Sequence, residues 1–375
     1  MKYCKLCLQP DTRPNTVFTD EGLCPACHYY EQSKGIDWNE RYEILLDLIK
    51  ATKRTPGQHF DCIIGVSGGK DSTRQALWVR DNLGLKPLLV SLSHPPQQVS
   101  QIGVDNISNL IEMGFDVVLS SPAPETWRKL MRESFFKFTN WARSSELALF
   151  SSVPQVAIKY GIPLIFWGEN PALQVGDLKT MGRNGYDGNN LRYSNTLSSG
   201  HAWMLEAGFR PDQILPYIYP SSEEFNVARI QIIYLGWFMG DWGLVQNASY
   251  TCPVGLSIRD ESPEDTGDLY GLSNLDEDWH NMNQMVKYLK FGFGKVTEYV
   301  NEELRLGLMD RPTAIHLVEQ YDGKCSDKYI GSFCEFMQIT REQFWSHVHG
   351  SVNRDLFEID TTGTIHRRFK VGVGL

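Results

Sequence analysis

The sequence lacks any run of about 18 apolar residues, the length that a helix needs to cross a bilayer. Its longest apolar stretch, residues 230–239, is typical of a buried helix rather than a membrane span. The first residues also lack the apolar core of a secretory signal peptide. We therefore expect a cytoplasmic protein that does not contact a membrane.

Positive charge is scarce as well. The chain has 36 Lys and Arg against 45 Asp and Glu, a formal net charge of −9. A general nucleic-acid-binding protein would carry a basic stripe, so we expect no nucleic-acid partner. A local basic pocket for a small anionic substrate is still compatible with this charge.

Cysteine is present, but not in the pattern of a disulfide scaffold. Eight cysteines without a secretory signal favour free thiols or metal ligands. Four of them form the pairs Cys4-x-x-Cys7 and Cys24-x-x-Cys27, separated by sixteen residues. Each pair places two thiolates on one side of a metal, and two pairs complete the tetrahedron that zinc prefers. The pattern predicts a structural zinc ribbon over residues 1–34, built on a short hairpin and stabilised by its metal.

Two other interpretations of these cysteines are open. Cys24-Pro-Ala-Cys27-His28 also has the form of a c-type haem attachment site. That interpretation requires an exported protein and leaves Cys4 and Cys7 unused. A redox-active pair is the second alternative, but two pairs at this spacing favour a closed structural zinc site.

Residues 61–83 combine an apolar strand, a glycine turn and an amphipathic helix. At a helix start, unpaired backbone N–H groups and the helix dipole attract anions. The turn, SGGKDS, offers a phosphate close backbone approach, hydroxyl donors and a mobile cation. The residues that supply these are Gly68, Gly69, Ser67, Ser72 and Lys70.

This turn is not a Walker A motif, because the four-residue spacer and the terminal Gly-Lys-Ser/Thr are absent. SGGKDS instead resembles the PP-loop of the ATP pyrophosphatases, enzymes that cleave ATP between the α and β phosphates. The resemblance implies adenylation of a carbonyl, carboxyl or amide oxygen with release of pyrophosphate. The alternative is a glycine turn that merely joins a strand to a helix.

Apolar strands alternate with helices through the first half of the chain. This pattern predicts an α/β fold with a doubly wound parallel sheet, in which ligands bind beyond the carboxyl ends of the strands. The expected strands are 61–66, 87–91, 116–119 and 164–167. The expected helices are 37–51, 73–83, 99–113 and 126–160, the last broken near Ser144 and Ser145.

Polar residues follow the last of these strands directly, in Gly168-Glu169-Asn170-Pro171. Glu169 can hold magnesium or orient a reacting group there, and Asn170 can hydrogen-bond a substrate. A plain turn that ends at Pro171 explains the same residues equally well. Residues 174–200, rich in Gly and Asn, are either a loop that covers the substrate or a surface excursion.

The second half of the chain gives weaker signals. Residues 222–242 have aromatic and aliphatic side chains at helical spacing, which predicts a core helix. Residues 267–283 are acidic, and we expect a solvated loop. The basic stretch 287–295 (KYLKFGFGK) makes Lys290 and Lys295 candidate contacts for pyrophosphate or substrate, unless it merely ends a surface helix.

Helices are also expected at 298–307, at 311–321 and at 332–348, where Thr340 can cap a segment. Residues 360–375 are expected to form a short hairpin or a loose end.

Over nearly the whole chain, these motifs resemble the N-acetyl sugar amidotransferases of bacterial surface-polysaccharide and nonulosonic-acid biosynthesis. The shared motifs are the paired cysteines, SGGKDS, GENPA (168–172), KFGFG (290–294) and VEQYDG (318–323). The family usually continues KFGFG with Arg, whereas Lys295 here keeps the charge but loses the bidentate fork. The resemblance implies a PP-loop domain of the adenine nucleotide α hydrolase-like type at 35–245. It also implies a mostly helical region at 246–375 that completes the substrate site.

The resemblance further implies that an acetamido group on a sugar becomes an acetamidino group. The amide oxygen would attack the α-phosphate of ATP, and ammonia would then displace AMP. Lys70 would neutralise charge on pyrophosphate, and Asp71 would hold Mg²⁺ together with Glu169. The residues expected to bind nucleotide or substrate are Ser67, Gly68, Gly69, Lys70, Asp71, Ser72, Gly168, Asn170, Lys290 and Lys295.

The ammonia source and the main alternative follow from the remaining cysteines. None lies in a nucleophile-elbow context, so the resemblance implies a separate glutaminase with a cyclase-like partner, similar to the two subunits of imidazole-glycerol-phosphate synthase. The alternative is ATP-dependent tRNA thiolation, whose PP-loop enzymes also carry zinc ribbons but use further cysteines. Only Cys62 and Cys252 are available for that role here. A zinc-ribbon scaffold with an inactive nucleotide site is disfavoured by the intact SGGKDS.

Overall fold

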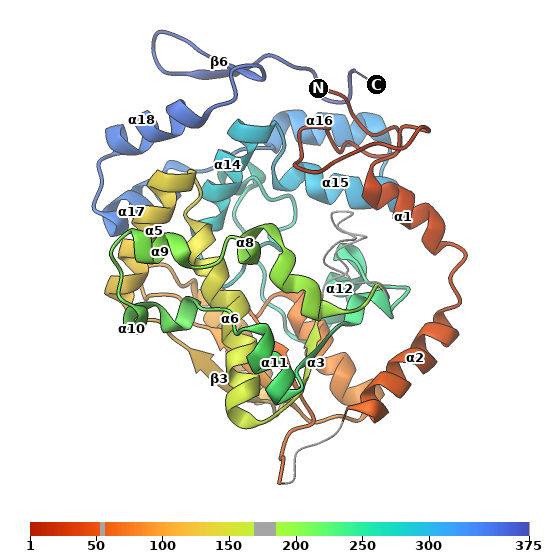
Figure 1. Cartoon of the computed structure of the whole chain (residues 1–375). Coiled ribbons are helices and arrows are strands. Elements are labelled where there is room, and N and C mark those ends of the chain that lie inside the picture. Colours follow the sequence, from red (N-terminus) through yellow and green to blue (C-terminus); the bar gives the residue numbers. More distant parts are fainter. Residues whose placement is uncertain (53–56, 169–184, 375) are drawn as a thin grey trace.

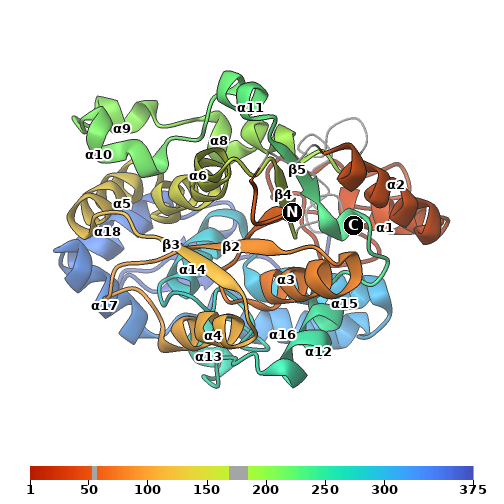
Figure 2. The same cartoon turned by 90° about the horizontal axis from the view of Figure 1, so that it is seen from below.

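A computed structural model describes residues 1–52, 57–168 and 185–374 of the chain (Figure 1). A parallel sheet of five strands lies at its centre, in the order β3-β2-β1-β4-β5 (Figure 2). Because β1 is the middle strand, the turn after it lies at the centre of the sheet's carboxyl edge. The strands are β1 (Cys62–Gly65), β2 (Pro87–Leu92), β3 (Asp116–Ser120), β4 (Leu164–Trp167) and β5 (Gln231–Tyr234).

Helices cover both faces of this sheet, as the predicted α/β fold requires. Ile63 of β1 packs into the core formed with α5 and α6, whereas Ile64 packs into the core formed with α2, α3 and α4. The strands are apolar on both faces because neither face meets water. These helices are α2 (Trp38–Ala51), α3 (Lys70–Leu83), α4 (Gln101–Glu112), α5 (Pro124–Phe138) and α6 (Ala142–Tyr160).

Short elements precede and follow β5. Those before it are η1 (Gly188–Tyr193), α8 (Asn195–Ser198), α9 (Ala202–Glu206), α10 (Pro211–Ile214), η2 (Leu215–Tyr217) and α11 (Ser222–Ala228). Those after it are η3 (Leu235–Trp237), α12 (Leu244–Thr251), η4 (Cys252–Val254) and α13 (Pro263–Thr266).

The C-terminal helices lie beside the N-terminal segment (Figure 1). The four paired cysteines share a core with Val296 and Val300 of α15 and with Val318 of α16. The two ends of the chain therefore share a hydrophobic core, which includes residues of α1 (Pro25–Ser33), α15 (Lys295–Leu306) and α16 (Arg311–Tyr321). The remaining C-terminal elements pack into the core that contains Ile63, α5 and α6; they are α14 (His280–Phe291), α17 (Asp327–Met337), α18 (Arg341–Ser351) and the hairpin β6 (Phe357–Ile359) and β7 (Ile365–Arg367).

Three sequence-based predictions about elements are wrong. Residues 222–242 do not form one core helix, because the β-branched pair Ile232 and Ile233 extends the sheet as β5. The break between α5 and α6 comes at Thr139, which has φ 47°, and not at Ser144 and Ser145. Residues 332–348 divide at Gln338, also left-handed, before Thr340 caps α18.

In the described part of the chain, no helix is both long and apolar enough to cross a membrane.

Candidate active site

The SGGKDS turn joins β1 to α3 and leaves a helix start open. Gly68 has φ 74°, and a Cβ there would lie 3.0 Å from Asn106 Cβ and 3.2 Å from the Gly103 carbonyl oxygen. Only glycine fits so close to α4 in this conformation. α3 begins at Lys70, and its N-cap Gly69 offers no side-chain hydrogen bond to the first turn. The first N–H groups of α3 are thus left for an anion.

Ser72 holds the turn together from inside. Its hydroxyl accepts the Ser67 N–H at 3.3 Å and donates to the Gly69 carbonyl oxygen at 3.2 Å. These two bonds close the turn over five residues, within the segment itself.

Lys70 and Asp71 form an ion pair, with 2.9 Å between Nζ and Oδ2. The other oxygen of Asp71 accepts the Asn247 amide at 2.6 Å, and Asn247 is held in turn by Arg74 at 2.7 Å. Burial opposes the ionisation of Asp71, but Lys70, Asn247 and the more distant Lys295 hold its pKa below the usual range. The carboxylate therefore stays charged and oriented, as a Mg²⁺ ligand must be.

A cavity of about 300 Å³ opens beside this turn. We call residues 65–72 the loop wall; all of them except Gly68 line the cavity. We call residues 272–276 together with Lys295 the C-terminal wall. The volume is at the lower end of the range for small-ligand sites, about 300–1,000 Å³.

The structure brings most of the predicted binding residues to this cavity. The lining includes Ser67, Gly69, Lys70, Asp71, Ser72, Gly168 and Lys295.

Among the described residues, two predicted ones, Gly68 and Lys290, are not part of this lining. Gly68 lies behind the turn against α4. Lys290 lies apart from the cavity, and its ammonium donates to the Phe138 carbonyl oxygen at 3.1 Å. Glu169 and Asn170, like the first part of the predicted loop at 174–200, lie outside the described residues.

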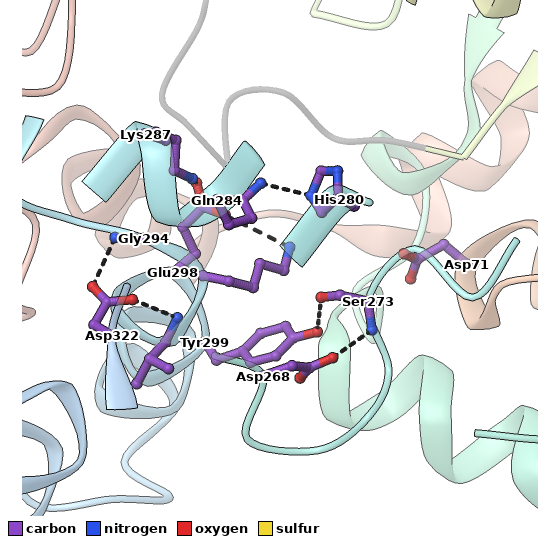
Figure 3. A network of polar contacts seen from close by, with 12 residues as sticks. Asp71, Asp268, Ser273, His280, Gln284, Lys287, Gly294, Glu298, Tyr299 and Asp322 are labelled. Carbon is purple, nitrogen blue, oxygen red and sulfur yellow. Dashed lines mark hydrogen bonds and ion pairs between the residues drawn. The ribbon is translucent and has the colours of Figure 1, made fainter. Parts of the chain in front are cut away.

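The acidic stretch 267–283 is not the solvated loop that we expect from the sequence. Asp268 is only 2% exposed and accepts the Ser273 N–H at 2.9 Å. The Ser273 hydroxyl meets the Tyr299 hydroxyl in the same network (Figure 3). These buried polar groups have partners, and they fix the backbone of the C-terminal wall.

Asp276 brings a carboxylate to the cavity. Its Oδ2 lies 3.1 Å from Nε2 of His94, which follows β2. Burial alone would lower the pKa of His94, but the bond to Asp276 outweighs it and raises that pKa above its ordinary value. Burial likewise opposes the ionisation of Asp276, yet His94 holds its pKa below the usual range. The pair therefore forms a persistent charged contact.

Three cations, Arg13, Lys287 and Lys295, surround the carboxylate of Glu298. Its carboxylate lies 2.6 Å from Arg13, 3.1 Å from Lys287 and 3.6 Å from Lys295; Figure 3 labels Glu298 and Lys287. Burial would raise the pKa of Glu298, but the cations hold it well below its usual range. Burial, with Lys295 and Lys287, lowers the pKa of His280 to about 3, so this ring stays neutral. Lys295 is thus a positioned cation on the cavity wall.

Sequence reasoning misses Asn247, Asp276 and the role of His94. Asn247 is 176 residues from Asp71, and Asp276 is 182 residues from His94. No local motif marks either pair. The one signal available is the acidic run 276–278 directly before an aromatic residue, which is unusual for a fully solvated loop.

The paired cysteines meet as the sequence predicts. The ligand atoms of Cys4, Cys7, Cys24 and Cys27 all lie within 4.8 Å of one another and are buried. The Cys24 N–H donates to the Cys4 sulfur at 3.2 Å, a contact that favours thiolate. Four buried sulfur atoms can hold a metal such as zinc. The predicted hairpin, however, is reduced to one bridge between Tyr3 and Pro10.

The structure argues against the haem interpretation of these residues. All four cysteines meet, whereas a haem site would leave Cys4 and Cys7 unused. His28 is exposed, and its ring contacts the Gln32 side chain at 3.0 Å.

Comparison with known families finds one match in the C-terminal part of the chain. Residues 269–370 match the model for the C-terminal domain of the LPS biosynthesis protein WbpG-like family. The match contains Glu298 and all of the C-terminal wall. It supports a role in lipopolysaccharide biosynthesis. Comparison with curated proteins finds no match.

Proposed function

We propose that this protein is an ATP-dependent amidotransferase that converts the N-acetyl group of a bacterial surface sugar to an acetamidino group. The observation that carries this proposal is one cavity in which the SGGKDS turn faces Lys295 and Asp276. The match of residues 269–370 to a lipopolysaccharide biosynthesis domain supports a sugar as the acceptor.

The loop wall fits the first step. The acceptor amide oxygen bonds to the α-phosphorus of ATP while the bond to pyrophosphate breaks. The open N–H groups at the start of α3, with Lys70, would stabilise the charge that develops on pyrophosphate. Mg²⁺, which Asp71 would hold, supplies further charge neutralisation.

The second step inserts nitrogen. Ammonia bonds to the activated carbon, and the carbon–oxygen bond to AMP breaks with its electron pair on AMP. Adenylation is required first because an amide oxygen is a poor leaving group. We further propose that the ammonia comes from a separate glutaminase with a cyclase-like partner. Residues 35–245 would act as the nucleotide domain and residues 246–375 as the acceptor region.

The thiolation alternative finds no support in the cavity. All eight cysteines lie in the described residues, and none of them lines it. Cys62 is buried in β1, and Cys252 is exposed in η4. PP-loop thiolation enzymes generally use further catalytic or cluster-binding cysteines near the activated carbon.

The test is an assay of AMP and pyrophosphate formation from ATP, MgCl₂ and ammonium chloride with a panel of N-acetylated sugars. Mass spectrometry of the products should show a loss of about one dalton where NH replaces oxygen. We expect both signals with at least one sugar and neither in Lys70→Ala. Absence of product with every sugar in the panel, together with formation of thiolated tRNA in a sulfur-donor assay, would overturn the proposal.

A further inference from the structure

Asp276 is the one carboxylate on the C-terminal wall of the cavity. Its Oδ2 lies 3.1 Å from His94 Nε2, its own backbone N–H also contacts the carboxylate, and no second side chain of the described residues hydrogen-bonds it. Its side chain is 20% exposed, although its neighbour Glu277 is 3% exposed. His94 thus fixes one oxygen of Asp276, and the other can accept a hydrogen bond from a ligand in the cavity.

Hydrogen bonds hold Asp276 at its own backbone and at the neighbouring Glu277. The Asp276 carbonyl oxygen accepts the Ser100 N–H at 3.1 Å, which ties the wall to the start of α4. Glu277 accepts the Trp279 N–H at 2.7 Å and the Gln98 amide at 3.2 Å. These bonds fix the backbone that carries Asp276, and the His94 contact orients its carboxylate. A group this well placed is suited to contact a reacting atom rather than bulk solvent.

The proposed reaction creates a need for such a carboxylate. Nitrogen that adds to the activated carbon carries a positive charge until it loses a proton. The product amidinium is also a planar cation, with two N–H groups directed like those of a guanidinium. A fixed carboxylate pairs well with both species.

We propose that Asp276, positioned by His94, forms the subsite for the entering nitrogen. Ammonia donates an N–H hydrogen bond to the free oxygen, and its lone pair forms the bond to carbon. The added nitrogen then passes one proton to Asp276, which releases it to solvent. The carbon–oxygen bond to AMP breaks with its electron pair on AMP, and the amidinium product pairs with the ionised Asp276 carboxylate. This inference rests on the proposed function.

The kinetic test separates the two steps. Exchange of labelled pyrophosphate into ATP, measured with the acceptor sugar and no ammonia, reports adenylation alone. In Asp276→Asn we expect this exchange to stay within about twofold of the unmutated protein, while kcat/KM for ammonium falls about 100-fold. His94→Gln should give a smaller loss of about tenfold in the same parameter. Asp260→Asn, which removes an exposed charge outside the cavity lining, should change neither step.

Equal losses in exchange and in amidine formation would overturn the proposal. That result, with a raised Mg²⁺ requirement, would make Asp276 a metal ligand or a structural group. Retained exchange together with an unchanged kcat/KM for ammonium would overturn it as well.

A binding test does not depend on a known acceptor. With AMP and MgCl₂ present, acetamidinium chloride should bind the unmutated protein more tightly than acetamide, its neutral analogue. Asp276→Asn should lose that preference. If no sugar yields an amidine, the proposed function fails, and this comparison still decides the subsite. Equal binding of the two compounds would overturn it.

Discussion

The two walls of the cavity are built in opposite ways. The turn of the loop wall is closed by contacts between residues close in sequence, such as Ser67 with Ser72, five residues apart, and Asn247 reaches it from outside only at Asp71. The C-terminal wall depends on contacts across the chain, such as His94 with Asp276, 182 residues apart. The hydrogen bonds that close the turn of the first wall lie within its own strand, turn and helix. The second exists only when the whole chain has folded.

This difference suggests a division of work between the walls. The unpaired N–H groups at a helix start, together with a lysine, can bind the phosphates of any nucleoside triphosphate. A carboxylate fixed by distant residues suits one kind of reacting group. Nucleotide activation and the entry of nitrogen should therefore be separable by mutation.

The largest effect should come from the loop wall. Lys70→Ala should lower the rate of pyrophosphate release by about 100- to 1,000-fold, because it removes a fixed charge from the leaving group. Lys295→Ala should cost about tenfold, because this lysine shares its charge with Glu298. Steady-state assays of both variants decide the order. Equal losses of rate in the two variants would contradict the proposed difference between the walls.

The next largest effect should come from loss of a metal held by the four cysteines, which should lower the stability of the C-terminal wall. Cys24→Ser should lose bound zinc and lower the melting temperature by about 5 °C or more, because the cysteines pack against α15 and α16. Metal analysis and calorimetry measure both quantities. Cys252→Ser, an exposed thiol, is the matched control and should change neither. A variant without zinc that melts normally would contradict the shared core.

Asn247 links the loop wall to α12. Asn247→Ala should raise the Mg²⁺ concentration for half-maximal pyrophosphate release several-fold and lower the rate about tenfold, because Asp71 loses the donor that orients it. Titration with MgCl₂ measures the change. Asn226→Ala, exposed on α11, is the control. An unchanged Mg²⁺ requirement would show that Lys70 alone orients Asp71.

The smallest effect concerns Glu277 and pH. Burial raises its pKa to about 7, so the folded state favours the protonated acid. Ionisation of Glu277 therefore lowers the free energy of unfolding. This loss is absent below the ordinary carboxyl pKa, grows as pH rises and is complete above about pH 7. Glu277→Gln should therefore gain roughly 1–3 kcal/mol in unfolding free energy at pH 8 relative to pH 5. Urea titrations at both pH values measure this gain, with Glu264→Gln as an exposed control. An identical pH profile in the unmutated protein and Glu277→Gln would refute it.

Sequence reasoning finds what is local and misses what is distant. The SGGKDS turn, four parallel strands and the meeting of the cysteines are predictable, because spacing and apolar runs determine them. β5 is not, because its residues also fit a helical pattern and only the neighbouring strand selects the extended form. The buried state of residues 267–283 is likewise hidden, because their partners lie on α15 and after β2.

The central claim is that both walls contact one nucleotide, and hydrogen–deuterium exchange tests it most directly. The ligand should be α,β-methylene-ATP with MgCl₂, because its bridging carbon prevents cleavage between the α and β phosphates. We predict slower exchange both in residues 66–75 and in residues 270–277. Protection of neither segment, or of the first segment alone, would contradict a single site closed by the two walls.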